Sequence, residues 1–194
     1  MPEGLTIDKG RTAIVVIDLQ KGIATRPAKP HDSADVVANA AKLVDAFRKN
    51  GMPVFLVHVN SAPGVGLRPI TDEEFSPPHH EMPPDWADFV PELKPAPSDV
   101  VITKRQWGAF YGTELDLQLR RRGISTIVLC GISTCIGVES TARDAYERGY
   151  DQVFVEDATS ARSVEEHQHT MTRIFPRLGR VRSTSEVLAA LKGE

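Results

Sequence analysis

The feature that most constrains the fold is an apolar run at residues 12–19, TAIVVIDL, in which the first charged residue is Asp18. A strand with one face in water alternates apolar and polar residues, whereas this run does not alternate. It therefore predicts a strand buried on both faces of a parallel sheet. Ligands of open α/β sheets bind beyond the carboxyl ends of the strands, so we expect chemistry near Asp18.

The rest of the chain alternates between helical and strand-like patterns. Apolar residues recur with a helical period over 34–50, and Gly51 is a typical C-cap. Further strands are predicted at 54–59, 100–103, 126–130 and 152–156, with helices near 113–122, 138–148 and 164–175 and a last short strand and helix. This alternation predicts one three-layer α/β/α domain over 1–194, Rossmann-like, with a mostly parallel sheet covered on both faces.

A proline-rich segment at about 60–98 interrupts the alternation and contains Trp86 and Phe89 as isolated large apolar groups. Long loops in compact domains are usually functional or disordered, and the aromatic content favours an ordered one. The segment is either a cap over the site or a crossover that packs on the surface.

Composition favours small-molecule chemistry. The formal net charge of −3 is spread along the 194 residues, which gives neither a nucleic-acid footprint nor a polybasic membrane patch. No apolar run approaches the roughly 20 residues that span a bilayer, and the N-terminus has no signal-peptide pattern, so we expect a cytoplasmic protein. Cys130 and Cys135 are too few for a disulfide framework and are expected to be free thiols.

Polar residues follow four of the apolar runs: Asp18, Asn60, Lys104 and the turn 131–137. Each alone has an ordinary explanation as a helix cap or a solvent contact. Together, an acid and a lysine at neighbouring strand ends stabilise each other's charge, and burial under the proline-rich segment would perturb both. The turn could present backbone N–H groups to an anion, with Ser133 and Thr134 as binding residues, or it could be an ordinary helix start capped by one of them.

Three segments carry a resemblance to a known family. AIVVIDLQKGI, VITKRQWGAFYGTELDLQLRRRGI and IVLCGISTCIGVESTARDAYERGY resemble the signature segments of the isochorismatase-like, or cysteine hydrolase, superfamily. The resemblance implies about six parallel strands, an Asp, Lys, Cys triad, a cis peptide that maps to Ile132-Ser133, and a homo-oligomer, dimer or larger. The aspartate falls on Asp18 and the lysine on Lys104, whereas the cysteine's position falls on Gly137.

Gly137 closes the acyl-enzyme route through a thiolate at that position. True isochorismatases are similar in having glycine there, and they hydrolyse a vinyl ether by protonating its enol carbon. We therefore predict a cofactor-independent hydrolase of a small, carboxylated substrate, in which Asp18 is the general acid and Lys104 orients the substrate. An aromatic wall of Trp86 or Phe89 with Trp107 and Phe110 is expected to desolvate the acid.

Two alternatives stay open: an amide hydrolase that uses Cys135 as a displaced nucleophile, and a binding homologue without turnover. Two departures from the family pattern leave the substrate open, namely Gly108 in place of a serine and Lys21-Gly22 in place of Asn-Asp.

No metal is predicted. The nicotinamidase branch binds its metal through an Asp-x-His segment, which residues 58–61 (HVNS) lack. His167 and His169 are two apart on a predicted helix, a spacing that does not place both on one face.

Overall fold

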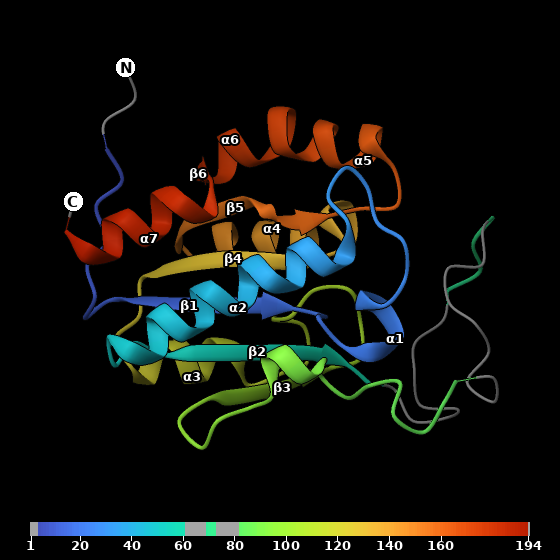
Figure 1. Cartoon of the computed structure of the whole chain (residues 1–194), viewed down its shortest axis with the longest axis horizontal. Coiled ribbons are helices and arrows are strands. Elements are labelled where there is room, and N and C mark those ends of the chain that lie inside the picture. Colours follow the sequence, from blue (N-terminus) through green and yellow to red (C-terminus); the bar gives the residue numbers. More distant parts are fainter. Residues whose placement is uncertain (1–3, 61–68, 73–81, 194) are drawn as a thin grey trace.

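The computed structural model describes residues 4–60, 69–72 and 82–193. In this part of the chain a single sheet has the strand order β3-β2-β1-β4-β5-β6, and every neighbouring pair is parallel (Figure 1). The strands are β1 (Thr12–Ile17), β2 (Val54–Val59), β3 (Val100–Lys104), β4 (Thr126–Ile132), β5 (Asp151–Ser160) and β6 (Arg180–Arg182). The predicted parallel α/β fold is confirmed.

Helices cover both faces of the sheet, which gives three layers (Figure 1). One face packs on α2 (Ser33–Lys49) and α7 (Thr184–Lys192), with Val36, Leu43 and Phe47 of α2 fully buried. The other packs on α3 (Leu115–Arg121), α4 (Glu139–Glu147) and α6 (Phe175–Leu178). Because β1 is buried on both faces, every side chain between Thr12 and Asp18 is apolar, which explains the uninterrupted run.

Several helices differ from the predicted ones. The short α1 (Lys21–Ala24) and the 3₁₀ turn η2 (Pro91–Leu93) were not predicted. A π-helical turn, η3 (Thr134–Val138), precedes α4. The helix predicted at 164–175 is α5 (Val164–His169), a second π-helical turn η4 (Thr170–Ile174), and then α6. Apolar periodicity marks the buried face but not which carbonyl each N–H bonds, so it does not distinguish these turns from α-helix.

Strand β5 continues past the predicted end at residue 156. The prediction stopped there because polar residues interrupt the apolar run. Its pairing with β4 shifts register between Leu129 and Gly131, and Glu156 and Asp157 are half-buried within the irregular stretch. Pairing resumes at Thr159. In the described residues, the helices are too short or too polar to cross a membrane.

Candidate active site

Asp18 and Lys104 form a buried ion pair at the carboxyl ends of β1 and β3. The Lys104 Nζ lies 2.8 Å from Asp18 Oδ2, and the side chains are only 2% and 6% exposed. Lys104 Nζ also donates to the Gln106 carbonyl. Asp18 has a φ of 55°, which is uncommon for a residue with a Cβ, and its N–H donates to the Val57 carbonyl of β2. The predicted contact between acid and lysine is therefore present, but their strands are not neighbours as predicted, because β2 lies between β1 and β3.

Burial dominates the chemistry of this carboxyl group. It raises the pKa of Asp18 above the ordinary value, because the loss of water outweighs the opposing attraction of the Lys104 ammonium. Oδ1 is buried and has no hydrogen-bond partner among the described residues. Asp18 thus has one oxygen held by Lys104 and a second one available for proton transfer.

The turn after β4 passes directly beside Asp18. Gly131 has a φ of 126°, and a Cβ there would lie 2.0 Å from the Ile17 carbonyl oxygen, so only glycine fits between β4 and β1. The Ile132–Ser133 peptide is cis, the geometry that the resemblance implied. Further along the turn, a Cβ at Gly137 would lie 3.0 Å from Asp18 Oδ2. The position of this turn whose Cβ would face Asp18 therefore has no side chain.

Cys135 has different neighbours. Its Sγ lies 3.8 Å from Ser133 Oγ, and burial raises the pKa of its thiol, with Glu166 and Glu139 adding to the effect. Carboxylates near a thiol disfavour the thiolate that a nucleophile needs. Cys130 is buried within β4, and burial raises the pKa of its thiol to about 12.

The end of the proline-rich segment packs along the chain that follows Asp18. The N–H of Gly22 donates to the Trp86 carbonyl, and Lys21 Nζ lies 2.9 Å from Asp85 Oδ2 and 3.5 Å from Asp88 Oδ2. A Cβ at Gly22 would lie 2.1 Å from the indole Nε1 of Trp86, so the ring lies flat on this glycine. Lys21 and Gly22, which form one of the two departures from the family pattern, therefore both contact this segment.

Two further residues, which the sequence analysis did not select, connect the same parts. Gln20 is fully buried; its Nε2 donates to the carbonyls of Val59 and Trp86, and its Oε1 accepts from the Val59 N–H. His58 bonds the Ala87 carbonyl through Nδ1 and stacks on Phe89 at 5.0 Å. In the sequence, Gln20 and His58 are marked only as polar residues near the carboxyl end of an apolar run.

The other predicted binding residues do not all lie beside the Asp18–Lys104 pair. Asn60 is exposed, and its N–H donates to the Lys104 carbonyl. Trp107 is 53% exposed, with its carbonyl oxygen 3.5 Å from the Cβ position at Gly137. Phe110 does not join this group: its ring lies 5.8 Å from that of Tyr150, which precedes β5 at the amino ends of the strands. The predicted place of Phe110 in the wall beside Asp18 is therefore wrong, because the sequence pattern does not specify which end of the sheet a residue contacts.

Thr134 faces a second group of polar side chains. Its Oγ1 lies 2.9 Å from Nδ1 of His167, whose Nε2 lies 3.1 Å from Glu156 Oε1, and His31 Nε2 lies 2.8 Å from the same oxygen. The two histidines lower the pKa of Glu156 to about 2, the hydrogen bond from His167 contributing most. His167 was considered only with His169, and the other two residues were not selected.

With this geometry established, the chain can be compared with known proteins. Residues 12–186 match the isochorismatase domain family. The chain belongs to the isochorismatase family. It is 55% identical to the uncharacterized isochorismatase family protein YwoC of Bacillus subtilis, over 99% of this chain and 100% of that protein. An isochorismatase family protein of Burkholderia thailandensis has the same fold, with a TM-score of 0.92, 49% identity and coverage of 98% of this chain and 100% of that one.

A more distant relative has a named activity. The chain is 30% identical to the ureidoacrylate amidohydrolase RutB of Rhizobium rhizogenes, over 81% of this chain and 74% of that protein. This chain is thus an isochorismatase-family hydrolase, and its relatives include a protein named as an amidohydrolase.

Proposed function

We propose that this chain hydrolyses a vinyl ether of a small carboxylated substrate, with Asp18 as general acid and without a covalent intermediate. The observation that carries the proposal is the contact between Gly137 and Asp18. We take Gly137 as the counterpart of the family's cysteine, and a glycine there offers no atom to attack the substrate. The raised pKa of Asp18 supports a carboxyl group that holds a proton for delivery.

The reaction needs only a proton and water. Asp18 would transfer its proton to the terminal enol carbon, which leaves an oxocarbenium ion at the ether carbon. Water would add to that carbon, and the resulting hemiketal would break its C–O bond to release an alcohol and a keto acid. The proton lost by the water would restore Asp18. Lys104 would hold the substrate carboxylate and balance the charge of Asp18 between turnovers.

We propose that residues 82–90, the described end of the proline-rich segment, form a cap on this site. Trp86 lies on Gly22, four residues after Asp18, and Trp107 borders Gly137, so both are placed to contact a substrate. Ser133 and Asn60 are further binding candidates at the strand ends. Thr134 contributes less directly, because its hydroxyl is engaged by His167. Phe110 has no part in the proposed site.

Amide hydrolysis through Cys135 is the second candidate, and the similarity to RutB favours it. The surroundings of Cys135 oppose it, since burial and two nearby glutamates raise the pKa of the thiol.

The test is a panel of carboxylated vinyl ethers, isochorismate among them, and small amides, assayed with wild type, Asp18→Asn and Cys135→Ala. We expect vinyl-ether turnover that falls by roughly 10²–10⁴-fold in Asp18→Asn, the usual contribution of a general acid, and is little changed in Cys135→Ala. Circular dichroism checks that both variants fold. Amide turnover that disappears in Cys135→Ala, or a covalent adduct on its sulfur, would establish the second candidate. Folded wild type without turnover on the panel would indicate a binding homologue.

A further inference from the structure

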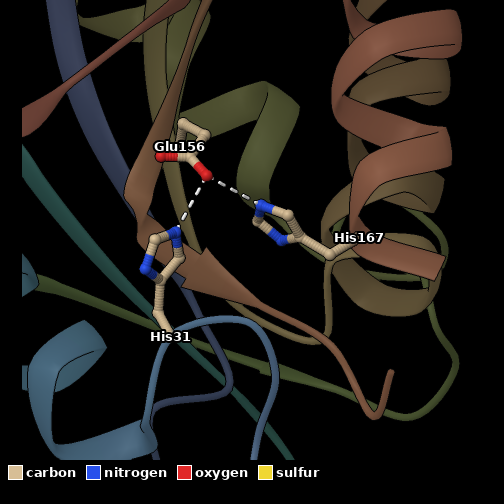
Figure 2. A group of neighbouring side chains, drawn as sticks. All are labelled: His31, Glu156 and His167. Carbon is tan, nitrogen blue, oxygen red and sulfur yellow. Dashed lines mark hydrogen bonds and ion pairs between the residues drawn. The ribbon is translucent and has the colours of Figure 1, made fainter. Parts of the chain in front are cut away.

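Three side chains from distant parts of the chain meet at one point: His31 before α2, Glu156 in β5 and His167 in α5 (Figure 2). A ligand atom from each lies within 4.8 Å of the other two. Both histidines direct Nε2 at the same carboxylate oxygen, Glu156 Oε1, as the dashed lines in Figure 2 show. These residues form the His31–Glu156–His167 cluster, and they are distinct from the proposed catalytic pair.

We propose that the His31–Glu156–His167 cluster is a zinc site with three protein ligands and one open position. Two imidazoles and one carboxylate form a donor set that zinc accepts, with bonds of about 2.0–2.2 Å. Tetrahedral ligands at that distance lie about 3.3 Å apart. Each Nε2 lies 2.8 or 3.1 Å from Oε1, so each of these two nitrogen–oxygen pairs needs to separate by only a few tenths of an ångström.

His167 is oriented by a hydrogen bond on its other ring nitrogen, as zinc ligands generally are. A ligating histidine generally has its other ring nitrogen fixed by a hydrogen bond, which sets the ring's orientation and tautomer. Nδ1 of His167 lies 2.9 Å from the buried Thr134 hydroxyl, and if Nδ1 donates this bond, Nε2 is left with a lone pair for the metal. The His31 and Glu156 side chains are 30% and 39% exposed, so the fourth position is open to water.

The backbone around the ligands is held independently of them. Lys29, two residues before His31, exchanges two backbone hydrogen bonds with Ala161, and Ser160 Oγ donates to the His31 carbonyl. A capping box formed by Ser163 and Glu166 fixes the start of α5, on which His167 lies. The ligands are therefore preorganised, and zinc would link the loop before α2, the end of β5 and α5.

Isothermal titration of the metal-stripped full chain with zinc chloride tests the proposal. We expect one zinc per chain, and a loss of affinity of more than about 100-fold in His31→Ala and in Glu156→Gln, which each remove a direct ligand. Thr134→Val, which removes only the hydrogen bond to Nδ1 of His167, should weaken binding by about 10–100-fold. These variants leave His167 in place, because its burial makes a replacement there a risk to folding.

Two controls separate this site from adventitious binding. His169→Gln changes an exposed histidine of α5, the helix that carries His167. The double variant His79→Gln/His80→Gln removes two histidines that are consecutive in the sequence of the proline-rich segment. Both should bind zinc as wild type does. Cobalt should give a tetrahedral visible spectrum in wild type that is lost in Glu156→Gln. Absence of binding in wild type, binding unchanged in both His31→Ala and Glu156→Gln, or binding lost with His79 and His80 would overturn the proposal.

Discussion

At the residue scale, Asp18 combines three features that rarely coincide by chance: a positive φ, nearly complete burial and an oxygen without a hydrogen bond among the described residues. Strain and unsatisfied polar groups concentrate at functional sites, where the surrounding structure enforces them. Lys104 holds the other oxygen and opposes the effect of burial on the Asp18 pKa.

Replacing Lys104 tests the general-acid role through the pH profile. Under the proposed mechanism, wild-type activity requires protonated Asp18 and falls as the pH rises through its raised pKa. Lys104→Met removes the charge that lowers this pKa, so the alkaline limb of kcat should move to higher pH, even though kcat/KM falls with weaker substrate binding. The matched control, Lys42→Met on the exposed surface of α2, should leave the limb in place. If the alkaline limb of Lys104→Met is unchanged or moves to lower pH, Asp18 is not the general acid.

At the element scale, the segment from 82 to 90 is held against residues 19–22 by backbone bonds, by Gln20 and by the two ion pairs of Lys21. The contact depends on Gly22, because the Trp86 ring occupies the space that any Cβ would need.

Gly22→Ala should therefore displace the indole. We expect a loss of about 1–3 kcal/mol in the free energy of unfolding, the usual cost of overpacking, with a red shift of tryptophan emission as Trp86 becomes more exposed. Urea denaturation and fluorescence measure the two effects. Gly10→Ala is the control, since a Cβ there meets only Asp8 Oδ1 at 3.5 Å. Equal stability of the two variants would show that Trp86 does not depend on this contact.

At the scale of the whole molecule, Glu156 connects parts of the fold that are far apart in sequence. It bonds His31, 125 residues earlier, and His167, 11 residues later, and so ties the loop before α2 and helix α5 to the sheet.

This contact predicts a pH-dependent contribution to stability. The pKa of Glu156 is lowered from 4.5 to about 2 in the folded chain, so its stabilisation is fully present above pH 4.5 and is lost as the pH falls towards 2. In metal-free protein, Glu156→Gln should be less stable than wild type at pH 7, and the difference should shrink at pH 3. Urea denaturation at both pH values measures it, with the exposed Glu165→Gln as control. A difference that is absent at pH 7, or that grows in acid, would refute this role.

The sequence by itself determined the parallel α/β fold and the pairing of Asp18 with Lys104. Strand 54–59 was predicted with its observed bounds, and β1 and β3 to within two residues. A buried strand is recognisable from its own apolar run, without knowledge of its partners. The two charged residues each end such a run, and parallel strands bring their carboxyl ends to one edge of the sheet.

Only the tertiary structure decided which side chains meet around that pair. It brought Gly137 to Asp18 and Trp86 to Gly22, placed Phe110 at the opposite ends of the strands, and gathered His31, Glu156 and His167. These contacts depend on how loops and helices dock over long sequence separations, and on π-helical turns and a strand irregularity that local periodicity does not encode. Patterning specifies that a residue is buried, whereas its partner is set by the packing of the whole chain.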